Sequence, residues 1–254
     1  MMDFDILSLW CAYPADTSQE ELGELGAAIL SIDEKERARA FQFAEDRHEF
    51  VTAHVLPRRA LSHHFPLAPH EWQFEAGANG KPRLLRSPGL RFNLSHTKDL
   101  VMCAISSGIE VGIDTEPRTR SKEIEEIASQ LLSLIEAQQM QHLSEQDKCD
   151  RFVDLWTGKE AFTKACGLGL SLPLKDISFS YSHHEDVKLE IDSSWGLNAD
   201  RFQFGWYSLS GHRVAIATER SMNLRVQLFE LRPLDVEPEC KGFININWHP
   251  RIRS

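Results

Sequence analysis

The sequence LWTGKEAFTKACGLGL, residues 155–170, has the pattern of a helix that ends at a glycine. Trp156, Glu160 and Lys164 follow one another at intervals of four residues, so a helix would place them in a row on one face. Gly167 and Gly169 come where helices commonly end in a left-handed residue. This face would offer an aromatic wall, a carboxylate and an ammonium group. Such a set suits chemistry on a metal-bound phosphate, with Glu160 for a cation or a proton and Lys164 for phosphate charge.

A second interpretation of the same helix needs no ligand. A Glu and a Lys four residues apart commonly form an exposed ion pair, which stabilises a helix by about 0.2–0.5 kcal/mol. On this stretch alone both interpretations stay open. Other phosphate-handling stretches elsewhere in the chain would favour the functional one.

The sequence EVGIDTEP, residues 110–117, predicts a strand that ends at Pro117. Asp114 and Glu116 are two residues apart, so their side chains lie on one face of that strand. A short and a longer carboxylate at this spacing can converge on an octahedral Mg²⁺ ion. An exposed acidic edge strand is the alternative, and the sequence leaves the two equally open.

The composition bounds the function. The chain has 254 residues and a net charge of −10, which argues against general nucleic-acid binding because that requires clustered Lys and Arg. The first residues have no basic leader before an apolar run, and no stretch is long and apolar enough to span a bilayer. Five scattered cysteines form no CxxC pair, which is typical of free thiols. We therefore expect a cytoplasmic protein without a membrane partner.

The order of expected elements predicts an α+β fold. A strand at 4–13 precedes helices at 18–29 and 33–64, the second broken or kinked at Pro57; strands follow at 90–97, 101–106 and 111–116. Helices at 123–141 and 146–165 precede strands at 177–181, 187–191, 202–209, 214–218 and 223–230. We expect two similar subdomains, 1–108 and 109–231, followed by a tail, 232–254. Each would be a small, mostly antiparallel sheet packed with helices, with the active site in the cleft between them.

The first half contains further candidates for anion binding. Lys81 follows the turn AGANG, residues 76–80, and Ser95 and His96 end the strand LRFNLSH, residues 90–96. Neighbours on a strand point to opposite faces, so His96 does not easily activate Ser95 as a nucleophile, and phosphate binding suits the pair better. A solubilising turn lysine and a packed histidine are the alternatives. The sequence HHED, residues 183–186, is interpreted as a solvated turn between strands.

Four stretches together resemble the 4′-phosphopantetheinyl transferases, in particular the monomeric type that activates surfactin synthetase. They are GKP at 80–82, FNLSHT at 92–97, VGIDTEP at 111–117, and LWTGKEAFTKACGLGLSLPL at 155–174. Each stretch is modestly specific, whereas their order and spacing together are highly specific. The resemblance covers about residues 35–180.

The resemblance implies a role for each matching residue. Mg²⁺ and the pyrophosphate of coenzyme A would be held by Asp114, Glu116 and Glu160, and Lys164 would contact the departing phosphate. The remaining coenzyme A contacts would come from Lys81, Pro82, Ser95 and His96, with Arg37 at the 3′-phosphate. The family often has a second basic residue where this chain has Glu34, so Lys35 or Arg39 would have to substitute there. The family also more often has Ile or Val at the position of Thr115, whose side chain would point away from the metal.

The implied reaction is attack by a carrier-protein serine on the pantetheine-side phosphorus of coenzyme A, releasing 3′,5′-ADP. Glu160 is the expected general base, and a metal-bound water is the alternative. The expected partner is an apo acyl carrier protein or peptidyl carrier domain, bound by a monomer through a local apolar patch. We expect that patch at residues 121–143, where Leu131, Leu132 and Ile135 would be partly exposed unless they belong to the core.

Two other functions fit parts of the sequence. A Mg²⁺-dependent nuclease or phosphohydrolase would use the same carboxylates and lysine, but it predicts a basic groove that the charge of −10 disfavours. A non-catalytic coenzyme A binding module would need Lys81 and His96 but not Glu160 or Lys164. Because all four are present, an enzyme is favoured.

Overall fold

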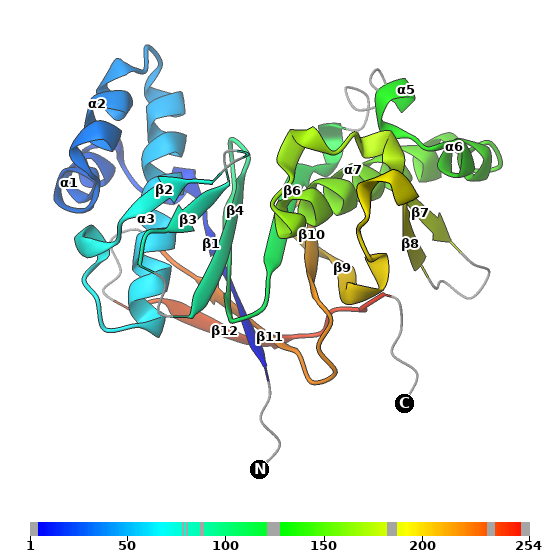
Figure 1. Cartoon of the computed structure of the whole chain (residues 1–254). Helices are drawn as coiled ribbons and strands as arrows, with labels where there is room; N and C mark the ends of the chain where they lie inside the picture. The colour runs from blue at the N-terminus through cyan, green and yellow to red at the C-terminus, as the bar shows by residue number, and fades with distance from the viewer. Residues whose placement is uncertain are drawn as a thin grey trace. The chain divides into compact units, whose positions relative to one another are not determined.

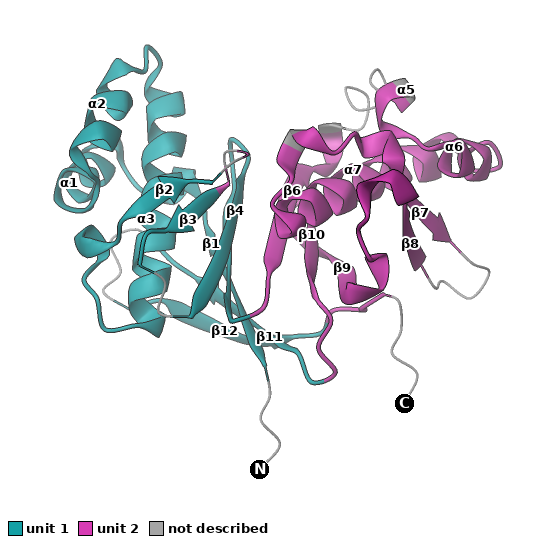
Figure 2. Cartoon of the chain, viewed as in Figure 1, with its two compact units in different colours: residues 1–77, 82–108, 223–245 teal, residues 78–81, 109–222, 246–254 magenta. Residues whose placement is uncertain are grey.

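The apolar segment ILSLWCA forms the strand β1 (Ile6–Ala12), which is buried from its second residue onward. A computed structural model gives the structure of residues 5–77, 79, 81–86, 89–120, 128–181, 187–232 and 237–249. The chain divides into two compact units (Figure 2). Unit 1 consists of residues 1–77, 82–108 and 223–245, and unit 2 of residues 78–81, 109–222 and 246–254.

Unit 1 is built on a five-stranded sheet with the order β12-β11-β1-β5-β4. Its other strands are β4 (Leu90–His96), β5 (Val101–Ser107), β11 (Arg225–Glu230) and β12 (Glu239–Ile244). β1 pairs parallel with β11, and the remaining pairings are antiparallel. A hairpin of β2 (Phe74–Ala76) and β3 (Pro82–Leu84) completes the strands described for this unit.

The α-helices described in unit 1 are α1 (Gln19–Ile29), α2 (Ile32–Ala40) and α3 (Ala44–His64) (Figure 1). Leu56 and Leu61 of α3 pack with Trp10 and Val101 of the sheet in one buried cluster. Its short 3₁₀ helices are η1 (Pro14–Asp16) and η2 (Pro69–Glu71).

Unit 2 contains the three-stranded antiparallel sheet β6-β10-β9 and the hairpin β7–β8. The strands are β6 (Val111–Pro117), β7 (Ile177–Tyr181), β8 (Val187–Ile191), β9 (Phe202–Leu209) and β10 (His212–Glu219). The helices are α5 (Ala128–Leu131), α6 (Leu134–Met140) and α7 (Glu145–Cys166). The 3₁₀ helices are η3 (Arg118–Arg120), η4 (Gly169–Ser171), η5 (Leu174–Asp176), η6 (Ser193–Trp195) and η7 (Ala199–Arg201). α7 packs on the sheet and shares one core with β9 and β10 (Figure 1).

The expected α+β class, with small, mostly antiparallel sheets packed with helices, is confirmed. The expected helix at 33–64 is two helices, because Ser31 caps α2 through a capping box with Glu34 and the chain is extended at Phe41 and Phe43. α3 continues through Pro57 to His64, so the expected helix break at this proline does not occur.

One boundary between the units lies after residue 108, as expected, whereas the expected boundary between residues 231 and 232 is not found. Residues 223–245 belong to unit 1, because β11 pairs with β1 and β12 pairs with β11. His249 bridges to Phe204 of β9 and belongs to unit 2. Three expected features fall wholly or partly outside the described residues: the helix start at 123, the turn at 183–186, and the tail at 233–236 and 250–254. Among the described helices, none is both long enough and apolar enough to cross a membrane.

Candidate active site

The helix α7 presents the predicted row of side chains to the strand β6. Ser144 caps its start, where its hydroxyl accepts the N–H of Asp147, and Gly167 ends it in the left-handed region with φ of 72°. The indole N–H of Trp156 donates to Oε1 of Glu116 at 3.1 Å. The ammonium of Lys164 donates to Oδ1 of Asp114 at 2.6 Å. The expected helix and its glycine end are thereby confirmed.

The absence of a side chain at Gly112 allows α7 to approach β6 closely. A Cβ atom at Gly112 would lie 1.9 Å from the carbonyl oxygen of Ala161 and 2.4 Å from the amide nitrogen of Ala165. Both distances are far below van der Waals contact, so any other residue would push the helix away from the strand. This close approach is what brings the side chains of the two elements together.

The carboxylates of β6 are buried beneath α7. Asp114 is 5% exposed and Glu116 is 7% exposed, so the alternative of an exposed acidic edge strand is wrong. The alternative of an exposed pair between Glu160 and Lys164 is also wrong, because Lys164 is three-quarters buried and pairs with Asp114. The same ammonium donates to the carbonyl of Ile113 at 3.1 Å. Two carboxylates, a group that is rarely buried, are thus buried at this contact beside a partly buried ammonium.

Glu160 belongs to the same electrostatic environment. Burial raises its pKa, and the neighbouring charges of Asp114 and Glu116 raise it further, while Lys164 opposes the shift. Three carboxylates and one ammonium therefore interact within a partly dehydrated site.

The oxygen donors of this site meet the chemical requirements of a hard metal ion. Mg²⁺ prefers oxygen ligands, and the three carboxylates supply them around one ammonium, so the chemistry of the site fits this ion. Within the described ranges no three His, Cys, Asp or Glu side chains are arranged as a ready-made metal site. In this structure the carboxylates of Asp114 and Glu116 accept from Lys164 and Trp156 instead.

The turn before β3 forms hydrogen bonds with β6 and with the residue that ends α7. Lys81 donates to the carbonyl of Val111 at 3.0 Å and lies 3.7 Å from the carboxylate of Glu110. The amide of Asn79 donates to the carbonyl of Gly167 at 2.9 Å, and Ser171 donates to Asn79 at 3.1 Å. The sequence predicts Lys81 as a candidate site residue but not Asn79. The signal that could have indicated Asn79 is its place in a turn, where asparagine side chains commonly bind the backbone. Pro82, the next residue, is exposed at the start of β3.

Apart from Pro82 on β3, the predicted residues of unit 1 lie on β4 and α2. Ser95 is buried and His96 is exposed, as expected for neighbours on a strand. Nδ1 of His96 lies 2.6 Å from Oε1 of Glu49, a partner that sequence reasoning missed because it comes from α3. Arg37 is exposed, and its guanidinium lies 5.1 Å from the ring centroid of Phe50.

Glu34 has a structural role in the first unit. Its Oε2 accepts the N–H of Ser31 at 2.9 Å in the capping box of α2. It also pairs with the buried guanidinium of Arg58 at 2.8 Å. The presence of an acid at this position is therefore explained by packing within unit 1.

The expected apolar patch is only partly present on the surface. Leu131 is 1% exposed and belongs to the core, which is the alternative that the sequence analysis left open for it, and Leu132 is partly buried against the same core. Ile135 is 42% exposed, and its neighbour Leu134, which the sequence analysis had not included, is 85% exposed. The start of α6 is the apolar surface that remains.

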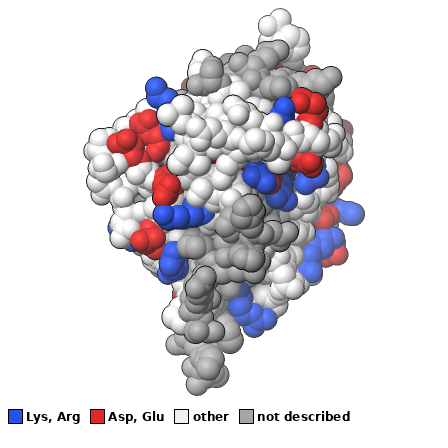
Figure 3. All heavy atoms as spheres, turned by 90° about the vertical axis from the view of Figure 1, so that its right-hand side faces the viewer, with Lys and Arg blue, Asp and Glu red and all other residues white. Residues whose placement is uncertain are grey.

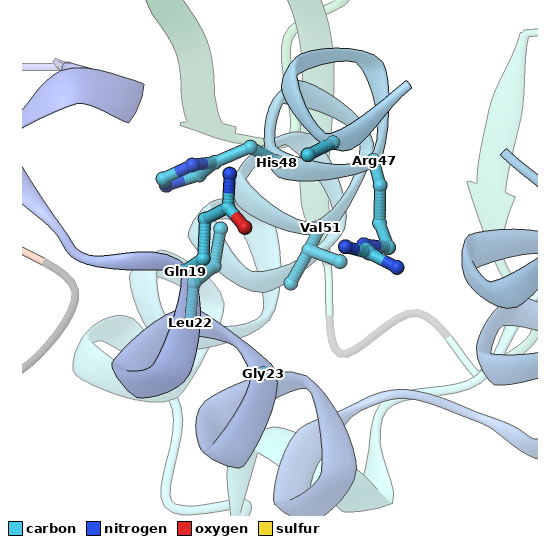
Figure 4. A pocket seen from close by; sticks show the side chains of 7 residues that line it. Gln19, Leu22, Gly23, Arg47, His48 and Val51 are labelled. Atoms are coloured by element: carbon cyan, nitrogen blue, oxygen red, sulfur yellow. The ribbon is translucent and has the colours of Figure 1, made fainter. Parts of the chain in front are cut away.

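Two cavities in unit 1 lie away from the predicted residues. One, of about 40 Å³, lies between α1 and α3 and is lined by Leu22, His48 and Val51 among others (Figure 4). The other, of about 400 Å³, is lined by residues that include Trp10, His63 and Phe229. None of the predicted site residues lines either of these two cavities.

Charged side chains are mixed on the face drawn in Figure 3. Lys and Arg alternate with Asp and Glu among uncharged residues, so the described part of this face carries no broad basic surface. A nucleic-acid groove would require such a surface.

Comparison with known proteins shows similarity over most of the chain. The model of the 4′-phosphopantetheinyl transferase superfamily matches residues 110–218, and the model "4′-phosphopantetheinyl transferase, N-terminal" matches residues 17–108. The chain is 33% identical to 4′-phosphopantetheinyl transferase HetI of Nostoc sp. over 196 residues, which is 76% of this chain and 81% of that protein. It is 35% identical to 4′-phosphopantetheinyl transferase Sfp of Bacillus subtilis over 176 residues, 69% of this chain and 75% of that protein. A holo-(acyl-carrier-protein) synthase from Bacillus anthracis, solved in complex with coenzyme A, aligns with a TM-score of 0.38 and 18% identity over 44% of this chain and 96% of that one.

Proposed function

The chain belongs to the 4′-phosphopantetheinyl transferase superfamily, in its Sfp-like type, and from this premise we propose that the contact of α7 with β6 is its active site. The protein is a transferase that moves phosphopantetheine from coenzyme A to a carrier protein. The observation that carries the assignment of the site is the buried arrangement of Lys164, Asp114, Glu116 and Glu160.

The reaction forms one P–O bond and breaks another. The hydroxyl of a carrier serine attacks the pantetheine-side phosphorus, its proton passes to a base, and 3′,5′-ADP leaves with the oxygen of the broken bond. Such a transfer depends on positioning and charge neutralisation more than on covalent help from the protein. Asp114, Glu116 and Glu160 would hold Mg²⁺, which neutralises pyrophosphate charge when it is bound.

Lys164 and Trp156 have tasks of their own in the proposal, and Glu160 has a second one. Lys164, already directed towards β6, donates to the departing phosphate. Glu160 accepts the proton of the attacking hydroxyl. Trp156 fixes the orientation of Glu116 by donating to one of its oxygens.

The nucleotide part of coenzyme A is assigned to other residues. Lys81, Pro82, Ser95 and His96 would bind the phosphates and the adjoining groups, and Arg37 would bind the 3′-phosphate. Because Glu34 is committed to Arg58 and to the start of α2, it would not compete for the guanidinium of Arg37.

We also propose the setting of the reaction. The partner is an apo acyl carrier protein or a peptidyl carrier domain, which docks at the exposed leucine and isoleucine that begin α6. The enzyme is a cytoplasmic monomer that binds neither nucleic acid nor membranes. Sedimentation at several protein concentrations tests the monomer, since a mass that rises with concentration contradicts it.

The decisive experiment measures the intact mass of an apo carrier protein after incubation with this protein, coenzyme A and Mg²⁺. We expect a gain of about 340 Da, the mass of one phosphopantetheinyl group. Glu160→Gln should lose at least about 100-fold in rate, as expected when a general base is removed. Glu145→Gln, at an exposed position on the same helix, is the matched control and should react like the wild type.

The outcomes separate the alternatives. Coenzyme A binding without any mass gain on several carriers would favour a binding module. Hydrolysis of phosphodiesters without carrier modification would favour a phosphohydrolase or nuclease. Transfer that persists undiminished after complete removal of Mg²⁺ by chelation would contradict the assignment of the metal.

A further inference from the structure

Two opposite charges are buried together in unit 2, outside the set of residues proposed for the reaction. Lys159 of α7 has no exposed surface, and Glu136 of α6 is 1% exposed. The ammonium of Lys159 donates to Oε2 of Glu136 at 2.5 Å and to the carbonyl of Leu131 at 2.7 Å. Lysine and glutamate are rarely buried to this extent, so the pair needs an explanation.

The carboxylate of Glu136 is held by donors from three different segments. Its Oε2 also accepts the backbone N–H of Ser133 at 2.9 Å, and its Oε1 accepts the N–H of Phe179 at 2.8 Å. The hydroxyl of Ser133 in turn lies 2.7 Å from that of Ser178. The pair therefore joins the end of α5, the start of α6 and the strand β7 to one residue of α7.

Stability alone does not account for this arrangement. Burial lowers the pKa of Lys159, which reflects the cost of dehydrating its charge, and Glu136 opposes that lowering. Replacing a buried ion pair by apolar residues of similar volume is often neutral or stabilising. Ion pairs of this kind are best attested as devices that select one packing arrangement over its alternatives.

The position of the pair on α7 indicates which arrangement is selected. Lys159 directly precedes Glu160, so the two side chains leave the helix about 100° apart. Fixing the first at Glu136 fixes the rotation of the helix about its axis, and with it the direction of the second. Gly158 of the same helix packs closely against Trp206, since a Cβ atom at this position would lie 2.8 Å from the indole ring. This contact also restricts the rotation of α7.

We propose that Glu136 and Lys159 are positioning residues of the active site. Their buried pair sets the rotation of α7, so that Glu160 and Lys164 meet Asp114 and Glu116 in the arrangement that binds Mg²⁺ and transfers the phosphoryl group. This inference rests on the proposed function. The buried pair thereby affects the rate of the chemical step without touching the substrate.

The test replaces both charges together, as Glu136→Leu with Lys159→Met, so that neither is left buried alone. We expect a folded protein with an unfolding midpoint close to that of the wild type. The kcat should fall by about 10- to 100-fold, with little change in the KM for coenzyme A. Calorimetry should show Mg²⁺ binding weakened by a similar factor, which is a readout independent of turnover.

The matched control removes an exposed ion pair from the same helix. Glu145→Leu with Lys148→Met deletes a pair that is 2.6 Å long with its glutamate 82% exposed. We expect the kcat and the Mg²⁺ affinity of this control to equal those of the wild type. A folded Glu136→Leu, Lys159→Met variant with wild-type kcat and Mg²⁺ affinity would overturn the inference.

A second variant decides the matter if the apolar pair does not fold. Glu136→Asp with Lys159→Arg keeps both charges but moves their contact, and it should fold with a lower kcat and weaker Mg²⁺ binding. Wild-type values for this variant contradict the inference. Absence of transfer by the wild type would instead contradict the proposed function, so the two failures are distinguishable.

Discussion

The hydrogen bond from Trp156 to Glu116 has a chemical counterpart elsewhere in unit 2. The indole of Trp156 donates to Glu116 at 3.1 Å, and the indole of Trp195 donates to Asp176 at 3.0 Å. Both are single N–H donors to a carboxylate, but only the first carboxylate belongs to the proposed site. Substituting each tryptophan in turn therefore distinguishes an effect on catalysis from an effect on stability.

Trp156→Phe should reduce kcat/KM by about tenfold, because Glu116 loses the donor that orients it. Trp195→Phe should leave kcat/KM unchanged, although each substitution should lower the free energy of unfolding by about 1–3 kcal/mol. Steady-state kinetics with a carrier protein and urea unfolding of both variants check this. Equal losses of activity in the two variants would show that the indole at 156 has no special role.

Individual residues also show what a sequence can predict about this site. For Asp114, Glu116, Glu160 and Lys164, spacing predicted which side chains share a face, because strand and helix periods are two and about four residues. Their proposed roles came from the family resemblance and not from spacing. The bond of His96 to Glu49 was not recognised, since its partners are 47 residues apart. Spacing does not distinguish a core leucine from an exposed one, so the sequence leaves the burial of Leu131 open.

At the scale of elements, the contact between α7 and β6 depends on a residue without a side chain. Gly112 lies opposite the backbone of α7, where a Cβ atom would overlap with the carbonyl of Ala161. The four proposed groups meet only if this spacing is kept.

Gly112→Ala should therefore separate the two elements. Overpacking of this kind costs about 1–3 kcal/mol, and we expect transfer activity to fall more than tenfold even in the folded fraction. Gly23→Ala is the control, since a Cβ atom within α1 would meet nothing within 4 Å. That substitution should instead stabilise the protein by about 0.5–1 kcal/mol. Urea unfolding with activity assays tests both, and a fully active Gly112→Ala variant would contradict the close-contact argument.

Local sequence patterns predict most of the helices and strands, and each wrong prediction has a physical cause. The strands β7, β8 and β9 begin and end where alternation and turn residues predicted. The prediction of one long helix at 33–64 is wrong, because the charged residues before and after Phe41 both favour a helix and hide the extended segment between them. The break expected at Pro57 failed because ten residues of α3, including this proline, are buried, and tertiary packing overrides local propensity.

At the scale of the whole molecule, unit 1 is assembled from three separate segments of the chain. Its central strand β1 lies between β5 and β11, and the pairing with β11 is parallel over six residue pairs. Ile6 of β1 pairs with Arg225 of β11, so the two strands are more than 200 residues apart in the sequence. Local sequence patterns do not predict a pairing between strands that are so far apart. For this reason the sequence analysis assigned β11 to the second subdomain.

Two truncated chains test the importance of this strand. A chain ending at residue 222 lacks β11 and β12, which leaves one edge of β1 unpaired, and we expect unit 1 not to fold. A chain ending at residue 231 keeps β11 and should retain the fold of unit 1, with lower stability. Both lose the bridge from His249 to Phe204, so that loss is matched. Hydrogen exchange of the amides in β1 and β5 checks the result, and equal protection in both truncated chains would contradict it.

The parallel pairing of β1 with β11 also constrains the order in which the protein can fold on a ribosome. Translation proceeds at about 5–20 residues per second, so the first strand waits roughly 10–40 seconds for its partner. Residues 109–222, the bulk of unit 2, emerge before residues 223–245 of unit 1 do. Unit 2, which carries the carboxylates proposed to bind Mg²⁺, can therefore reach its native state while unit 1 is still incomplete. During that interval the edge of β1 that later pairs with β11 is accessible to chaperones and to other nascent chains.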